Sequence, residues 1–123
     1  MLDTNFVLLY VENPLASAAF YAELLDRKPI ESSPSFVMFL LDGGQKLGLW
    51  SRKTVEPAAN ATGGGAELAI PVANADAVRA AHADWSRRQI KIIQEPTPMD
   101  FGYTFTAADP DGHRLRVFAP SQS

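Results

Sequence analysis

The chain has 123 residues, of which 46% are hydrophobic and 20% charged, a composition typical of one folded domain and unlike that of a disordered segment. Its formal net charge of -3 gives the chain no overall basic character that would attract nucleic acid or an anionic membrane, so neither is an expected partner. The absence of cysteine excludes disulfides and thiolate sites, and no apolar run approaches the ~20 residues of a membrane span. Together these features predict a cytoplasmic protein.

A weak internal repeat, at a spacing of about half the chain, predicts the fold. Each half begins with an apolar strand that ends in Val-x-Asn and continues with a helix and three short strand candidates. The prediction is an α+β fold of two βαβββ modules, which form a concave mixed sheet with the helices on its outer face. Within a single domain, residues 1–123, we expect one module at about 1–55, a linker at about 56–65 and a second module at about 66–120.

The strands and turns follow in chain order from apolar runs and turn residues. After the first strand, which ends at Val11, strands are expected around residues 29–31, 36–41, 46–50, 67–72, 90–94, 103–106 and 114–118. Asp42-Gly43-Gly44 is typical of a hairpin turn, and Asp109-Pro110-Asp111-Gly112 of a type I turn. His113 follows the second turn and is expected at the surface.

Two asparagines are expected to begin the helices. The side chains of Asn13 and Asn74 can accept hydrogen bonds from the free N–H groups of a helix start, and Pro14 suits the first helical position. His82 falls on the polar side of the second helix and is expected to be solvated. The core-facing residues are predicted to be Leu15, Ala18, Ala22 and Leu25 in the first helix and Val78, Ala81 and Trp85 in the second.

The alternation of side chains along each strand indicates which residues share a face of the sheet. Gly48 and Trp50 point to the same side, and Glu67 lies on the face that the helices do not cover. On the last strand, Arg114 and Arg116 share a face with Phe118. Small and charged residues around one large aromatic are typical of a concave lining.

The paired Val-x-Asn helix starts, the segment AFYAELLDRKP and the final DPDGHRLRVFAP resemble the vicinal oxygen chelate superfamily, which includes glyoxalase I, extradiol dioxygenases and bleomycin resistance proteins. Within it, the segments LGLWSRK, ELAIPV and QEPTPMDFGYTFTAADPDGHRLRVF are most similar to phenazine antibiotic resistance proteins. The resemblance spans nearly the whole chain and implies a homodimer. Both pairing of the modules within a chain and exchange between protomers occur in the superfamily, and the sequence leaves that choice open.

The resemblance also implies where a metal would bind. Metal-dependent members carry ligands on the first, fourth, fifth and eighth strands, and the matching positions here hold Phe6, Gly48, Glu67 and Arg116. Only Glu67 could ligate a divalent cation, and the permanently charged Arg116 would repel one. Because a catalytic metal needs about three protein ligands, we expect no metal, no other cofactor and no catalytic residues.

The expected function is therefore binding: a metal-free homodimer that sequesters a planar aromatic antibiotic, phenazine-like, and confers resistance. The resemblance places such a ligand against an aromatic residue at the dimer interface, and Trp50 matches it. The predicted ligand-binding residues are Trp50, Arg116, Glu67, Gly48, Phe6, Phe101 and Tyr103. Three of these have open alternatives, because Trp50 could instead cap the core, and Glu67 and Arg116 could form a structural ion pair.

Two other functions stay open. One is a metal-dependent glyoxalase-type lyase or isomerase, or an extradiol dioxygenase, with an unusual metal site. The other is a small structural or regulatory dimer whose cavity is filled by its own aromatic side chains. Metal content after purification would distinguish the enzyme, and failure of every flat aromatic compound to bind would favour the structural dimer.

Overall fold

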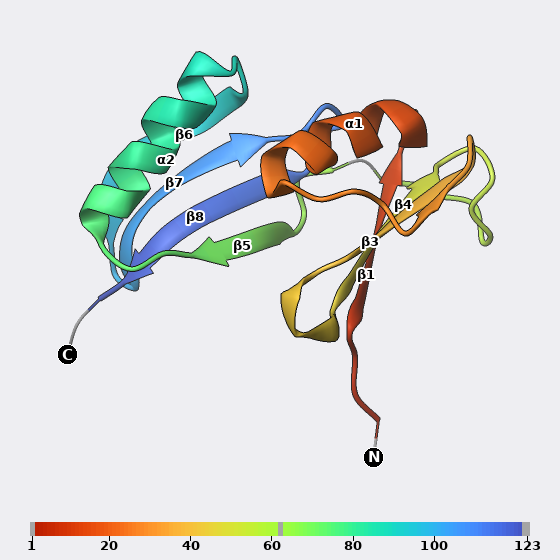
Figure 1. Ribbon diagram of the computed structural model, residues 1–123, viewed down its shortest axis with the longest axis horizontal. Helices are drawn as coiled ribbons and strands as arrows, with labels where there is room; N and C mark the ends of the chain where they lie inside the picture. Colours follow the sequence, from red (N-terminus) through yellow and green to blue (C-terminus); the bar gives the residue numbers. More distant parts are fainter. Residues whose placement is uncertain (1, 62, 122–123) are drawn as a thin grey trace. The chain divides into compact units, whose positions relative to one another are not determined.

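A computed structural model describes residues 2–61 and 63–121, and the chain divides into two compact units, residues 1–62 and 63–123 (Figure 1). The elements of the first unit are β1 (Phe6–Val11), α1 (Pro14–Leu25), β2 (Glu31–Ser32), β3 (Phe36–Leu40), the short 3-10 turn Asp42–Gly44 and β4 (Lys46–Ser51). Those of the second are β5 (Glu67–Pro71), α2 (Ala75–Arg87), β6 (Lys91–Met99), β7 (Gly102–Ala108) and β8 (Arg114–Pro120). The α+β fold of two βαβββ modules is confirmed.

Each module has its own four-stranded mixed sheet, with the same topology in both. The strand orders are β1-β4-β3-β2 and β5-β8-β7-β6. In each sheet the first strand of the module pairs in parallel with its last strand, and the other pairs are antiparallel. The first strand of each module is consequently an edge strand, with one side of its backbone outside the sheet.

Both helices begin where the sequence predicts. The Asn13 side chain accepts a hydrogen bond from the N–H of Ala16 at 3.2 Å, and Asn74 accepts one from Ala77 at 2.9 Å. α1 packs on β3 and β4, whereas α2 packs on β6, β7 and β8, so each helix covers one face of its own sheet. The opposite face of each sheet carries no helix of its own module and is called here its open face.

The prediction for the core-facing side of α1 is correct for Ala18 but wrong for Leu15. Leu15 is exposed, and the buried face carries Ser17, Ala18 and Tyr21, with Tyr21 fully buried. Most of the helix is apolar, so its hydrophobic pattern hardly distinguishes one side from the other. In α2, whose outer side is charged, the predicted Val78 and Trp85 are indeed buried.

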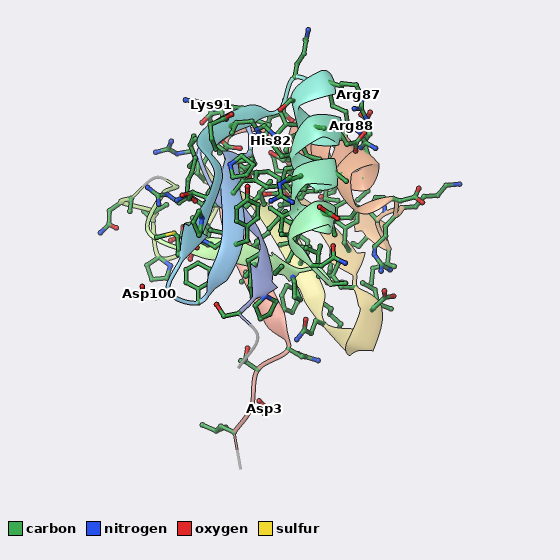
Figure 2. All side chains as sticks on the ribbon, turned by 90° about the vertical axis from the view of Figure 1, so that its left-hand side faces the viewer. Asp3, His82, Arg87, Arg88, Lys91 and Asp100 are labelled. Atoms are coloured by element: carbon green, nitrogen blue, oxygen red, sulfur yellow. The ribbon has the colours of Figure 1, made fainter. Side chains whose placement is uncertain are left out.

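His82 is not solvated as predicted. Its ring packs edge-on against the buried Phe105, with centroids 5.3 Å apart, and its Nε2 lies 3.3 Å from a carboxylate oxygen of Glu95. Figure 2 shows the His82 side chain between α2 and the strands of its sheet. Within the described residues, neither helix has the length and apolar character that a bilayer span requires.

Candidate functional site

The open face of the first sheet presents aromatic side chains in register across three strands. Tyr10 on β1, Trp50 on β4 and Phe36 on β3 are direct cross-strand neighbours. The next level of the same face carries Leu8 and Met38, with Gly48 between them. Gly48 and Trp50 share a face, as predicted. A residue without a side chain thus lies beside the largest aromatic side chain of the sheet.

The indole of Trp50 is braced on both sides by perpendicular rings. Its centroid lies 6.3 Å from that of Tyr10 at an interplanar angle of 81°, and 6.4 Å from that of Phe36 at 89°. Edge-to-face pairs of this kind are favourable for aromatic quadrupoles and restrict the rotamers of all three residues. Trp50 is only partly buried, so part of this braced indole faces solvent.

An open hollow of about 410 Å³ lies on this face, lined by Phe6, Leu8, Phe36 and Trp50. The neighbours of Gly48 lean over it: a Cβ atom built there would come within 2.7 Å of Leu8 Cδ2, 2.9 Å of Phe6 Cε1 and 3.0 Å of Phe36 Cζ. The space directly above Gly48 is therefore occupied by hydrocarbon from both sides, and these side chains form the floor and wall of the hollow. The missing side chain of Gly48 allows them to lie close to the backbone of β4.

The open face of the second sheet is polar and is organised by Arg116 on β8. Its Nε and Nη2 donate to the two carboxylate oxygens of Glu67 at 2.7 and 2.9 Å, a bidentate pair. Its Nη1 donates to Gln94 Oε1 at 3.0 Å and to Thr104 Oγ1 at 3.2 Å. Arg116 on β8 thereby binds side chains on β5, β6 and β7, all three other strands of its sheet.

The ion pair changes the titration of both partners. The hydrogen bond and positive charge of Arg116 hold the pKa of Glu67 below its ordinary value, although partial burial acts in the other direction. The same contact raises the pKa of Arg116. Both groups are therefore charged at neutral pH, and the Glu67 carboxylate is engaged within the protein.

Phe101 and Tyr103, predicted together as ligand-binding residues, lie on opposite faces of the second sheet. Phe101, in the turn between β6 and β7, has its ring centroid 5.7 Å from the Arg116 guanidinium carbon and 6.1 Å from the ring of Phe118. Tyr103 points the other way, where Arg79 of α2 stacks on its ring at 4.8 Å. Phe101 belongs with the open face, and Tyr103 with the helix.

The residues that the family resemblance assigns to metal-ligand positions do not fit a metal. Phe6 and Gly48, in the first module, offer no donor atom, and both oxygens of Glu67 accept hydrogen bonds from Arg116. Among the described residues, no group of three or more His, Cys, Asp or Glu side chains could hold a metal ion. The donor set therefore suits an internal ion pair rather than a divalent cation.

Sequence reasoning missed several residues that complete these faces. Leu8 and Tyr10 share the open face with Phe6, and Gln94 and Thr104 hold Arg116 in place. Alternation along β1 could have indicated the first two, because they follow Phe6 at every second position. The partners of Arg116 depend on strand register, which a single sequence does not give.

Comparison with known proteins agrees with this architecture. The family model of the Glyoxalase/Bleomycin resistance protein/Dioxygenase superfamily matches residues 4–117. The chain belongs to this superfamily.

Among curated proteins, the phenazine antibiotic resistance protein EhpR of Enterobacter agglomerans is 33% identical to this member over 116 residues, which cover 92% of this chain and 88% of EhpR. The solution structure of protein ATC0852 from Agrobacterium tumefaciens is 54% identical, has a TM-score of 0.92 and matches 99% of this chain and 100% of its own. A glyoxalase-related enzyme from Fulvimarina pelagi, at 20% identity, has a TM-score of 0.83 over 97% of this chain and 88% of its own, and shares the fold.

Proposed function

We propose that this superfamily member is a metal-free, homodimeric cytoplasmic binding protein that captures a planar aromatic antibiotic of phenazine type and confers resistance by sequestering it. The observation that carries the proposal is the hollow lined by Phe6, Leu8, Phe36 and Trp50 on the open face of the first sheet. The name of EhpR, which describes resistance to a phenazine antibiotic, supports the same ligand class.

The chemistry of the hollow favours a flat, apolar ligand. Three of its four lining side chains are aromatic and the fourth is a leucine. An offset or edge-to-face contact with a ring such as Trp50 contributes about 0.5–1.5 kcal/mol beyond the burial of apolar area. Because Tyr10 and Phe36 already brace the indole, binding would order few side chains and so lose little entropy.

The same lining supports binding without chemical change. None of its four side chains ionises or carries a nucleophile, and general acid-base or covalent catalysis needs such a group within reach of the ligand. The engaged carboxylate of Glu67 supports the metal-free part of the proposal. Sequestration requires only affinity, which this surface can supply.

The homodimer is supported by the exposure of β1. This edge strand leaves Phe6, Val7, Leu8 and Tyr10 exposed, and they project to both faces of the sheet. An apolar edge strand is a liability for a monomer, and partner association is one way in which proteins cover it. A second copy of the chain is the partner that the family resemblance implies.

Tryptophan fluorescence tests the proposal directly. Metal-stripped protein is titrated with phenazine-1-carboxylate and, in parallel, so are Trp50→Phe and Gly48→Ala. We expect saturable quenching in the parent protein, its loss in Trp50→Phe, and affinity about fivefold to tenfold weaker in Gly48→Ala, because the added methyl pushes Phe6, Leu8 and Phe36 into the hollow. Trp85, which lies on α2 and is buried against Phe105, remains in all three proteins as an internal reference.

The bound compound is then recovered and analysed by mass spectrometry. Sequestration predicts that it returns unchanged. Binding or turnover that appears only after a divalent metal is added would contradict the proposal and favour a lyase, isomerase or dioxygenase. Absence of quenching up to millimolar ligand, with near-ultraviolet circular dichroism of a folded protein, would favour the structural dimer.

A further inference from the structure

A second hollow, of about 270 Å³, lies on the open face of the second sheet and differs in chemistry from the first. It is lined by Ile93, Gln94, Thr106, Arg114 and Arg116. Its lining is mostly polar and cationic, with the partly exposed Ile93 as the apolar wall. A hollow of this size is at the lower end of small-molecule sites, which suits a compact ligand.

The two arginines of this hollow are in different states. Arg116 is 16% exposed and donates to Glu67, Gln94 and Thr104. Arg114 is 46% exposed, and its guanidinium lies 3.7 Å from a Glu67 oxygen that already accepts from Arg116 at 2.9 Å. Arg114 is therefore loosely paired, and its planar fork can turn to a ligand at little energetic cost.

The surroundings of Arg114 add positive charge. Lys91 on β6, Ala108 on β7 and Arg114 on β8 are cross-strand neighbours at one level of this face. The methyl group of Ala108 is the only side chain between the two cations, and Figure 2 shows Lys91 at the end of the β6–β7 hairpin away from Asp100. Among the strand residues in register at this level and the next, the charged side chains of this face are Lys91, Arg114, Arg116 and one carboxylate, Glu67. This part of the sheet is therefore basic, although the chain carries a net charge of -3.

A carboxylate with an apolar body matches this combination. A guanidinium binds a carboxylate through two parallel N–H groups, and Lys91 raises the local concentration of anions. The Gln94 amide Nε2 donates to Met99 Sδ at 3.4 Å. Because a thioether is a weak acceptor, this N–H group can leave the sulfur and donate to a ligand oxygen instead. Ile93 offers hydrocarbon to the rest of the molecule.

We propose that this hollow is a binding site for an organic carboxylate, with Arg114 as the residue that binds its oxygens and Arg116 as the residue that shapes the floor. The site lies wholly in the second module and does not depend on the aromatic hollow of the first. It assigns ligand recognition to Arg114 rather than to Arg116, which the Glu67 pair keeps in place.

The test uses benzoate as the probe and compares it with neutral benzamide and with inorganic phosphate. Binding of each compound is measured by isothermal titration and by the amide chemical shifts of the full-length protein. We expect benzoate to bind and to shift the amides of β6 and β8, and benzamide and phosphate to bind at least about tenfold more weakly. Arg114→Gln should weaken benzoate binding at least about tenfold. Arg87→Gln, which removes the same charge from the exposed side of α2, should leave it unchanged.

Three results would overturn the inference: equal binding of benzamide and benzoate, equal losses in Arg114→Gln and Arg87→Gln, or preferential binding of phosphate. Arg114 is about half exposed and only loosely paired, so its replacement should leave the fold intact, and the amide spectrum of the variant verifies this. Quenching of Trp50 by a phenazine reports on the other module, so failure of one proposal is distinguishable from failure of the other.

Discussion

Arg116 stands where the family resemblance implies a metal ligand, and in the structure it cross-links the second sheet. Its four hydrogen bonds to Glu67, Gln94 and Thr104 connect all strands of the second sheet. Hydrogen bonds to charged groups contribute more than neutral ones, and a bidentate pair also fixes orientation. Of the two roles that the sequence left open for Glu67 and Arg116, the structure shows the ion pair, and ligand contact stays a prediction.

Glu67→Gln tests this cross-link through its pH dependence. The pKa of Glu67 is lower in the folded protein than its ordinary value of 4.5, so the ionised pair stabilises the fold above pH 4.5, and this contribution is lost as pH falls through the folded pKa. We expect Glu67→Gln to lower the free energy of unfolding by about 1–2 kcal/mol at pH 7. The difference from the parent protein should shrink steadily below pH 4.5. Urea unfolding at a series of pH values measures both quantities.

Glu12→Gln is the matched control for that experiment. The pKa of Glu12 is also lowered, by a hydrogen bond from Lys53, but that pair is exposed to solvent. Exposed pairs contribute little, so the control should lose less stability than Glu67→Gln. A stability deficit in Glu67→Gln that stays constant down to pH 3 would show that packing, rather than the ionised pair, is responsible.

At the scale of elements, the turn before β8 sets the position of both arginines. Asp109, which is buried, accepts hydrogen bonds through Oδ1 from the N–H groups of Asp111 at 2.8 Å and His113 at 2.9 Å. Gly63 packs against this turn so closely that a Cβ atom there would lie 2.6 Å from the backbone nitrogen of His113. The turn is therefore stabilised by the Asp109 carboxylate and by the close packing of Gly63, which precedes β5.

Asp109→Ala should lower the free energy of unfolding by about 1–3 kcal/mol, because two backbone N–H groups lose their shared acceptor. Asp109→Asn keeps an acceptor oxygen and should recover part of that stability. Chemical denaturation gives the stabilities, and hydrogen exchange at Asp111 and His113 locates the effect. Equal losses in the alanine and asparagine variants would indicate that the negative charge, and not the acceptor geometry, stabilises the turn.

Local signals predicted the elements well where they were strong. Asn13 and Asn74 each followed an apolar strand and each begins a helix, and the strand after the Asp109 turn starts at Arg114 as expected. β6 extends to Met99, past the predicted end, because this edge strand tolerates prolines and register shifts. The packed side of α1 was not predictable, since Leu15 and Tyr21 are both apolar and only the tertiary structure decides between them.

At the scale of the whole molecule, the repeat and the family resemblance predicted two modules, and alternation separated the two faces of each sheet. That reasoning put Gly48 beside Trp50 and Arg114 beside Arg116. It could not pair Trp50 with Tyr10, or Arg116 with Gln94, because those contacts follow from the register between strands distant in sequence.

The proposed homodimer makes a prediction for the whole molecule. Light scattering after size exclusion should give twice the mass of one chain, and the melting temperature should rise with protein concentration, because association stabilises the folded state by mass action. Val7→Lys, a change on β1 outside the aromatic hollow, should shift the mass toward that of one chain. A single-chain mass at all concentrations, with full affinity for the phenazine, would leave the hollow as a monomer site and remove the dimer from the proposed function.

The separation of core and open faces has a consequence for how such a protein can change. The buried side chains that stabilise the first sheet, among them Val37, Phe39, Leu47 and Leu49, alternate with the residues that line its hollow. Substitutions at Phe6, Leu8 or Phe36 can therefore alter the shape offered to a compound while the packing beneath stays intact. Selection for a different compound would act on a few positions in β1 and β3, and a library confined to those positions would retain the scaffold.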